Sequence, residues 1–224
     1  MSPRFSEQQV RDLAGRAYES HASFEVTPET SALLVIDMQD EFVRPGWTPY
    51  WVPDATRLVP GIQRLIELCR RSAIPVIFTA FADTHHGTDR PRPGALMPNR
   101  YPGIPHEPEW FRHGTIWHEL QPHPDDIVIH KPSYGAFHDT PLQTILSNLG
   151  RDTIIICGTL TNFCCGTTAR QGYERGFKVV VVSDLTATDD DQLHEAELRT
   201  LRKGFARVMS LQDLVTAASQ TSMT

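Results

Sequence analysis

Residues 153–182, TIIICGTLTNFCCGTTARQGYERGFKVVVV, decide the fold of this chain. The stretch opens and closes with short, continuously apolar runs of mostly β-branched residues, Thr153–Ile156 and Lys178–Val182. Between them, residues 162–176 have the pattern of a helix, and Gly176 stands where that helix should stop. Short, fully apolar strands joined by a helix are typical of a parallel sheet whose two faces are both covered.

The same alternation extends over most of the chain. Four further apolar runs predict strands, and four further segments predict helices. We therefore predict an α/β protein with three α/β/α layers and a six-stranded, mostly parallel sheet. The further strands are predicted at Ala32–Ile36, Val76–Thr79, Ile127–Ile129 and Ala206–Met209, and the further helices at about 57–72, 140–150, 189–203 and 211–218.

The N-terminal segment precedes this alternation. Residues 1–30 are predicted to form an arm that carries an amphipathic helix over 6–22, with Ser6 as its cap. Residues 31–224 are predicted to form a single domain, as the chain length allows. The arm would suit packing on a partner subunit.

Residues 81–125 interrupt the alternation. They are rich in Pro, Gly, His and aromatic residues and are too long for a simple connection between two elements. Trp110, Phe111 and Trp117 indicate that the segment is packed rather than disordered.

Composition excludes several classes of function. The 224 residues are 40% apolar and 21% charged, and the net charge is −6 with the basic residues scattered, so no nucleic-acid partner is expected. No apolar run is long enough for a signal peptide or a membrane span. We therefore expect no membrane partner. The four cysteines make no CxxC pair and no zinc-ligand spacing, and we interpret the chain as a reduced, cytoplasmic protein with mostly buried thiols.

Three residues with reactive side chains follow three of the predicted strands. In an open parallel sheet, ligands bind beyond the carboxyl ends of the strands. Asp37 ends the first strand, Lys131 ends the third, and the fourth runs into the cysteines at 164 and 165. Each residue also has a structural interpretation, as a helix cap, a solvated lysine or a buried small hydrophobe. Their convergence on one edge favours a shared site.

The two adjacent cysteines are predicted to have different roles. In the first turn of the helix, free N–H groups and the helix dipole would stabilise a Cys164 thiolate, and Lys131 would lower the thiol pKa further. Cys165 is rotated by about 100° around the helix and should point into packing. We therefore predict that Cys164 is the nucleophile and that Cys165 is structural.

Three motifs resemble the signatures of the isochorismatase-like cysteine hydrolases: VIDMQDEF, HKPSYGAF and GTLTNFCCGTTARQGYERGFKVVVVSDLTAT. The resemblance covers about residues 30–215 and implies a six-stranded parallel sheet. It implies a catalytic triad of Cys164, Lys131 and Asp37, with no metal or organic cofactor. It also implies a cis peptide at Leu160–Thr161, which would aim the backbone amides of Thr161 and Cys164 at one oxyanion.

Branches of this family differ in chemistry. Its vinyl-ether-cleaving isochorismatases typically lack the cysteine, so Cys164 favours hydrolysis of a small amide through a thioester. The segment KPSYGAFHDTPLQTIL and Asn162 resemble the ureidoacrylate, biuret and N-carbamoylsarcosine amidohydrolases. An isochorismatase-type ether hydrolase, a nicotinamidase-like amidase with a metal and a non-catalytic member of the fold remain alternatives. The family also suggests a homo-oligomer, either a dimer or a tetramer.

The nicotinamidases of the family hold a metal on an Asp-x-His motif after the second strand. Asp83-Thr84-His85 has that spacing but lies further from Thr79 than the family pattern places it. Asp83, His85 and His86 are therefore interpreted as loop residues, and no metal site is predicted.

Other residues are candidates for the substrate pocket, although core packing and solvated helix surface are their alternative interpretations. His194 and Arg170 suit recognition of a substrate carboxylate, but a position on a solvated helix face is the favoured interpretation of both. The candidates for the pocket wall are Phe42, Trp47, Tyr134, Phe137, Asn162 and Phe163, together with the 81–125 excursion.

Overall fold

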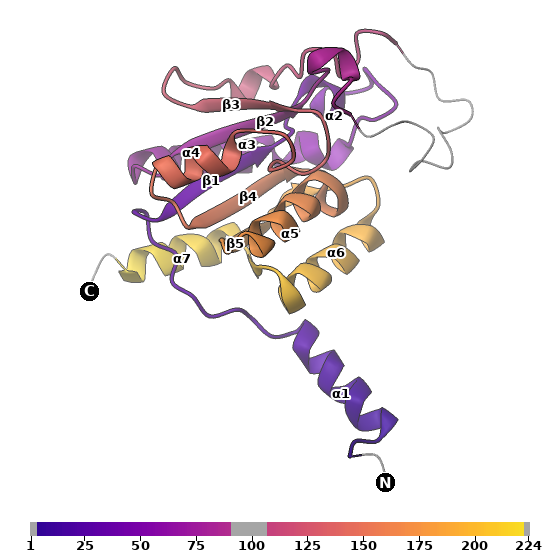
Figure 1. The fold of residues 1–224 in the computed structure, drawn as a ribbon, viewed down its shortest axis with the longest axis vertical. Coiled ribbons are helices and arrows are strands. Elements are labelled where there is room, and N and C mark those ends of the chain that lie inside the picture. Colours follow the sequence, from indigo (N-terminus) through magenta and orange to yellow (C-terminus); the bar gives the residue numbers. More distant parts are fainter. Residues whose placement is uncertain (1–3, 91–106, 222–224) are drawn as a thin grey trace.

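The structure is a computed structural model that describes residues 4–90 and 107–221. Six strands form one sheet in the order β3-β2-β1-β4-β5-β6, and every neighbouring pair is parallel (Figure 1). The predicted fold class is confirmed, and the sheet is entirely parallel. The strands are β1 (Ser31–Ile36), β2 (Val76–Phe81), β3 (Ile127–Lys131), β4 (Thr153–Thr159), β5 (Lys178–Ala187) and β6 (Arg207–Met209).

Helices cover both faces of the sheet, which is why the central strands read as unbroken apolar runs. Along β1, Leu33 and Val35 pack on the side of α3 and α7, whereas Leu34 and Ile36 pack on the side of α4, α5 and α6. The helices are α1 (Glu7–Tyr18), α2 (Asp40–Val43), α3 (Pro53–Arg71), α4 (Leu142–Asn148), α5 (Gly166–Glu174), α6 (Asp191–Gly204) and α7 (Leu211–Thr221), with short turns η1 (His85–Gly87), η2 (His118–Leu120) and η3 (Thr161–Cys165).

The strand order creates a crevice at the carboxyl edge of the sheet. From β1 the chain proceeds outward to β2 and β3, and it then returns to pair β4 with the other side of β1. Connections leave β1 and β4 toward opposite faces, and this switch point is where open α/β sheets bind ligands. The register aligns Ile36 with Thr79 on β2 and with Gly158 on β4, so the residues that follow these strands share one edge.

Local signals account for most element boundaries. Ser6 and Gln9 form the capping box that starts α1, and Gly150 and Gly176 have positive φ just beyond α4 and α5. The helix predicted to start at Thr140 begins at Leu142, whose amide donates to the Thr140 hydroxyl at 3.3 Å. The short helix α2 and the π-type turn η3 were not predicted as separate elements.

The described part of the 81–125 excursion is packed against the rest of the protein. Phe111 lies against the rings of Phe42, Tyr50 and Phe81, with centroids 5.2–5.5 Å apart. The Trp117 amide donates to the Met38 carbonyl at 2.9 Å, just beyond β1. The remainder of the excursion, 91–106, lies outside the described residues.

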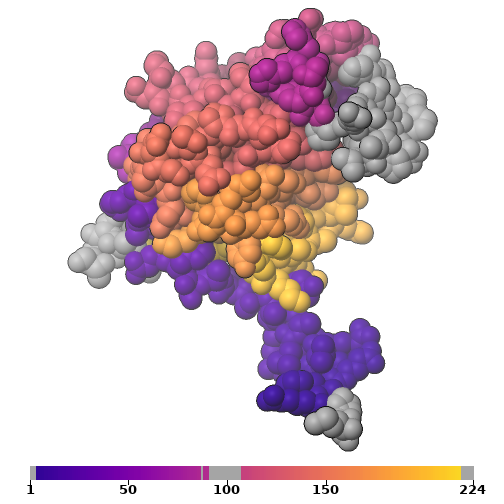
Figure 2. Space-filling view, in the orientation of Figure 1, coloured from indigo at the N-terminus to yellow at the C-terminus, as the bar shows by residue number. Residues whose placement is uncertain are grey.

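The N-terminal helix α1 stands away from the body of the molecule (Figures 1 and 2). Its end contacts α6, where the Lys203 ammonium lies 3.8 Å from the centroid of the Tyr18 ring. Arg207 donates to the Phe24 carbonyl at 2.7 Å in the segment that joins α1 to β1. The division into an arm and a single domain at residue 30 stays a prediction. Within the described residues, no helix has the length and apolar character needed to cross a bilayer.

Candidate active site

Asp37 is the first residue beyond β1 and is fully buried. Its φ of 48° turns the chain out of the strand, a backbone conformation that non-glycine residues adopt mainly in turns and functional sites. The Asp37 amide donates to the Thr79 carbonyl at 3.1 Å, and the Thr79 hydroxyl donates to Asp37 Oδ1 at 2.8 Å. Strand β2 therefore fixes the carboxylate from both its backbone and its side chain.

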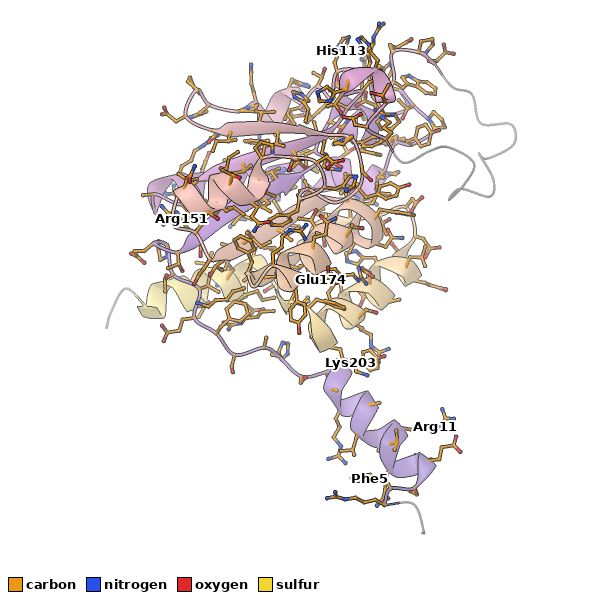
Figure 3. The ribbon with its side chains drawn as sticks, in the orientation of Figure 1. Phe5, Arg11, His113, Arg151, Glu174 and Lys203 are labelled. Carbon is orange, nitrogen blue, oxygen red and sulfur yellow. The ribbon has the colours of Figure 1, made fainter. Side chains whose placement is uncertain are left out.

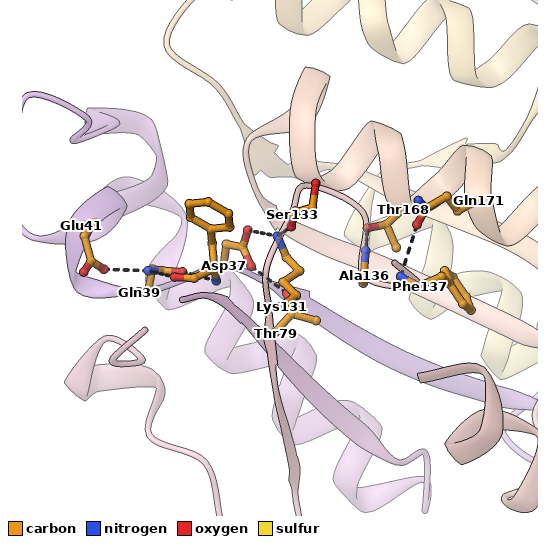
Figure 4. A network of polar contacts seen from close by, with 11 residues as sticks. Asp37, Gln39, Glu41, Thr79, Lys131, Ser133, Ala136, Phe137, Thr168 and Gln171 are labelled. Carbon is orange, nitrogen blue, oxygen red and sulfur yellow. Dashed lines mark hydrogen bonds and ion pairs between the residues drawn. The ribbon is translucent and has the colours of Figure 1, made fainter. Parts of the chain in front are cut away.

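Lys131 ends β3 and is also fully buried. Its ammonium lies 2.7 Å from Asp37 Oδ2 and donates to the Ser133 carbonyl at 2.8 Å (Figure 4). Asp37 Oδ2 is the carboxylate oxygen that faces the Lys131 ammonium in this ion pair. A buried pair of this kind is costly to desolvate and favours a functional explanation over a stabilising one.

Cys164 lies in η3, directly after β4. Close approach of β4 to β1 requires Gly158, which has a φ of 114° and would overlap the Ile36 carbonyl if it carried a Cβ. The Cys164 thiol is within hydrogen-bonding reach of both Asp37 and Lys131. The structure thus brings together the three predicted residues from three strands.

Cys165 is fully buried in the core cluster on the side of α4, α5 and α6. This position matches the interpretation of Cys165 as a packing residue. All four cysteines are free thiols.

The state of the Cys164 thiol differs from the expectation of a stabilised thiolate. Burial raises its pKa well above the ordinary value, the neighbouring Asp37 carboxylate raises it further, and Lys131 lowers it by less. For Lys131, burial lowers the pKa, but Asp37 and Cys164 outweigh that effect and raise it overall. Burial and the Asp37 carboxylate therefore both favour the protonated form of the Cys164 thiol, and the Lys131 ammonium opposes them.

The cis peptide lies at Thr159–Leu160, so the prediction of Leu160–Thr161 was wrong by one bond. Strand β4 stays paired through Thr159, which faces Ala187 of β5, and η3 begins at Thr161. The Leu160 carbonyl accepts from the amides of Phe163 and Cys165, at 3.2 and 3.1 Å. The reversal between strand and turn therefore falls on the peptide that precedes Leu160. The amides of Thr161 and Cys164 stay predicted oxyanion donors.

The predicted pocket residues occupy different surroundings. Tyr134 and Phe163 are both 39% exposed, and their rings lie 5.4 Å apart, bridging the segment after Lys131 and the turn that carries Cys164. Phe137 is buried against Phe177 in the core. The others lie as follows: Phe42 packs on Phe111, Trp47 lies beneath the Arg44 guanidinium, and Asn162 accepts from the Thr188 hydroxyl at 2.7 Å.

Two residues considered for carboxylate recognition have protein partners. Arg170 forms a two-bonded ion pair with Glu197 of α6. His194 Nδ1 lies 2.9 Å from the Thr161 hydroxyl, so His194 is not simply a residue on a solvated helix face. This contact was missed because it depends on how α6 packs on η3.

A buried polar network beside the triad was also missed. Gln39 exchanges hydrogen bonds with the Phe81 backbone at 2.7 and 3.0 Å and donates to Glu41 at 2.7 Å (Figure 4). Glu41 accepts from the Phe111 amide at 2.8 Å. The available signal was two polar residues, Gln39 and Glu41, within the short motif after β1. These hydrogen bonds connect the 81–125 excursion to the carboxyl ends of β1 and β2.

The loop after Lys131 is hydrogen-bonded to α5. The Ala136 amide donates to the Thr168 hydroxyl at 2.9 Å, and the Phe137 amide donates to Gln171 Oε1 at 3.2 Å (Figure 4). Because α5 continues directly from η3, these bonds couple the lysine loop to the cysteine turn.

The Asp-x-His motif after β2 lies on the surface. His85 is exposed, and its Nδ1 is 2.9 Å from Asp89. Asp83 and His86 are exposed as well. Over residues 4–90 and 107–221, no three His, Cys, Asp or Glu side chains are grouped to share a metal ion.

Comparison with known proteins finds relatives over most of this chain. The family model described as Isochorismatase domain matches residues 31–213. Nicotinamidase 3 of Arabidopsis thaliana is 33% identical over 206 residues, which cover 89% of this chain and 93% of that protein. Enterobactin synthase component B of Escherichia coli is 31% identical, over 85% of this chain and 64% of that protein. The solved structure of a cysteine hydrolase from Pseudomonas syringae has a TM-score of 0.79 and 28% identity, and covers 90% of this chain and 98% of that chain.

These relatives span several branches of one family. They also include a ureidoacrylate amidohydrolase, RutB of Methylobacterium radiotolerans, at 27% identity over 81% of this chain and 76% of that protein. The comparisons therefore do not single out the branch that the motifs resemble.

Proposed function

The chain belongs to the isochorismatase family of hydrolases, and from this premise we propose that it is a cysteine-dependent amidohydrolase. The substrate would be a small non-peptide amide or an N-carbamoyl compound, cleaved at its C–N bond with release of ammonia or an amine. One observation carries the proposal: a thiol, a carboxylate and an ammonium meet in a buried site that three separate strands build.

The protonated thiol defines the first step. Because burial raises the pKa of Cys164, its proton must leave as the sulfur attacks, and Asp37 is the base within reach. Lys131 keeps its positive charge and stabilises the sulfur as it gains negative charge. Cys164 Sγ then forms a bond to the amide carbon, and the carbonyl oxygen becomes an oxyanion.

The oxyanion is placed against the amides of Thr161 and Cys164. One donor of this kind is typically worth about 3 kcal/mol in the transition state. When the intermediate collapses, the C–N bond breaks, and protonated Asp37 transfers its proton to the leaving nitrogen. Ammonia or an amine departs, and a thioester on Cys164 remains.

Water completes the cycle. Asp37 removes a proton from the water, the oxygen attacks the thioester carbon, and the C–S bond breaks. The Asp37 proton returns to sulfur, so the sum of the steps is amide plus water giving carboxylic acid plus amine. N-carbamoyl substrates would give carbamic acid at this stage, which decomposes to carbon dioxide and ammonia or an amine.

The direct test is ammonia release from a panel of small amides and ureido acids by wild type, Cys164→Ser, Cys165→Ser and Asp37→Asn. The panel contains ureidoacrylate, N-carbamoylsarcosine, biuret, maleamate and nicotinamide, and one arm contains a chelator. We expect activity on at least one amide that is lost in Cys164→Ser, retained in Cys165→Ser and unchanged by the chelator.

Two outcomes would change the assignment. Activity that survives in Cys164→Ser and is lost in Asp37→Asn would indicate acid catalysis of the vinyl-ether type. Activity that the chelator abolishes would indicate a metal-assisted amidase. Inactivity on every substrate offered, together with no reaction of Cys164 toward electrophiles, would contradict a thiol hydrolase.

A further inference from the structure

The first turn of α6 contacts the turn that carries the nucleophile. Asp190 caps α6, with its carboxylate accepting from the Leu193 amide at 2.9 Å and its carbonyl accepting from the His194 amide at 2.9 Å. This cap fixes His194 at the start of the helix. There His194 Nδ1 lies 2.9 Å from the hydroxyl of Thr161, the first residue of η3.

The same helix supports the neighbouring backbone. Glu197, one turn beyond His194, pairs with Arg170 of α5, and its carboxylate occupies the space beside Gly166 that a Cβ would need. Just before α6, Thr188 donates to Asn162 at 2.7 Å. Contacts from 188–197 therefore reach η3 and the first turns of α5.

Thr161 depends on His194 for a side-chain partner. Thr161 is fully buried, and a buried hydroxyl is costly without a hydrogen bond. The η3 backbone has π-type geometry, which is rare and frequently occurs at functional sites. Within the described residues, His194 supplies the side-chain hydrogen bond to the Thr161 hydroxyl.

We propose that His194 is a positioning residue, which orients Thr161 so that its backbone amide points at the developing oxyanion. The inference rests on the proposed function, because it assigns His194 a role through the oxyanion donor of that reaction. His194 touches neither the thiol nor the substrate in this role. The bond to Thr161 fixes the side-chain rotamer, and through it the peptide that carries the amide.

This role predicts a specific kinetic signature. An oxyanion donor acts in the transition state and hardly in the ground state, so loss of its alignment lowers kcat and leaves KM nearly unchanged. We expect kcat to fall about tenfold or more in His194→Leu, because removal of a whole donor costs about 100-fold. His194→Asn should recover part of the loss, since its amide can occupy the place of Nδ1. Glu195→Ala, an exposed neighbour on α6, is the matched control.

A double-mutant cycle separates positioning from general support of the fold. Thr161→Val removes the hydroxyl and keeps the β-branched shape, so it should reproduce the kcat loss of His194→Leu. If His194 acts through Thr161, the double variant loses no more than either single variant. Melting temperatures measured in parallel show whether all variants are folded.

Binding of a small aldehyde makes the test independent of the natural substrate. The Cys164 sulfur adds to the aldehyde carbon, the thiol proton passes by way of Asp37 to the aldehyde oxygen, and the resulting hemithioacetal oxygen occupies the oxyanion position. With carbon-13-labelled acetaldehyde and NMR detection, wild type should form the adduct, Cys164→Ala should not, and His194→Leu should bind at least about fivefold more weakly than Glu195→Ala.

The outcomes distinguish the two claims. If wild type forms the adduct and hydrolyses amides but His194→Leu matches the control in both assays, the role of His194 is overturned and the proposed function stands. Additive losses in the double-mutant cycle, or a change confined to KM, would also overturn it. If wild type forms no adduct and hydrolyses no amide, the proposed function fails and the role of His194 fails with it.

Discussion

At the residue scale, two adjacent cysteines have different environments within one turn. Both thiols are buried in the cluster on the side of α4, α5 and α6, but Cys164 is within hydrogen-bonding reach of Asp37 and Lys131, whereas Cys165 is affected only by their charges. Consecutive residues of the turn η3 point in different directions, which explains the difference. The thiol environment was misjudged from sequence, because helix N-termini and a nearby lysine suggest a low pKa whereas burial dominates.

Substitution of Asp37 should separate thiol reactivity from hydrolysis. The Asp37 carboxylate raises the Cys164 pKa, so Asp37→Asn lowers it and increases the thiolate fraction at pH 7.5, tenfold for each pKa unit. Alkylation of Cys164 by iodoacetamide should therefore become faster, while amide hydrolysis falls about 100-fold or more through loss of the base.

The opposite effect on the rate of Cys164 alkylation is expected for Lys131→Met. Lys131 lowers the Cys164 pKa, so its removal raises that pKa further and slows alkylation at the same pH. Peptide mapping after each time point assigns the label to Cys164. Slower alkylation in Asp37→Asn than in wild type would contradict the electrostatic account of this site.

Cys165→Ala should retain activity. The substitution removes only a buried sulfur, so the free energy of unfolding should fall by about 1 kcal/mol and kcat should stay within about twofold of wild type. Denaturant titration and ammonia release measure the two quantities. A loss of activity comparable to that of Cys164→Ser would show that the assignment of the two thiols is reversed.

At the element scale, the sheet could be predicted because its strands are short apolar runs, whereas the turns that shape the site could not. Helix α2 has four residues and no periodicity, and η3 differs from the start of an ordinary helix only in its hydrogen bonds. Thr79 was predicted only as the end of an apolar strand, but its hydroxyl donates a hydrogen bond to Asp37 Oδ1. These features depend on which strands become neighbours, and periodicity does not encode that.

Because β4 lies so close to β1, any side chain at position 158 should destabilise the fold. A Cβ there would meet the Ile36 carbonyl, and a φ of 114° is unfavourable for alanine. Gly158→Ala should lower the free energy of unfolding by about 3 kcal/mol or more. Gly204→Ala is the control, because nothing lies within 4 Å of the added Cβ, and it should stay within about 1 kcal/mol of wild type. Equal stability of the two variants in urea would contradict the close packing of β1 and β4.

At the scale of the whole molecule, α1 and the residues just before it extend from the body and present apolar side chains to solvent. Phe5, Val10 and Leu13 are all more than half exposed, and Figure 3 shows Phe5 at the outer end of the arm. We propose, as the family resemblance suggests, that the protein is a homo-oligomer and that the arm packs on a second copy. Val10→Asp with Leu13→Asp should dissociate it to monomers in sedimentation analysis. Gln8→Asp with Gly15→Asp adds the same charge on the opposite face of α1 and should not. A monomeric wild type would contradict this proposal.

The central claim is that Cys164 becomes acylated during turnover. The most direct measurement is mass spectrometry of enzyme quenched in acid within milliseconds of mixing with an amide it hydrolyses, followed by peptide mapping. The account predicts a thioester on Cys164, with the mass of the acyl group, that forms and decays at rates compatible with kcat. Active turnover that leaves Cys164 unmodified at every time, with undiminished activity in Cys164→Ala, would contradict it.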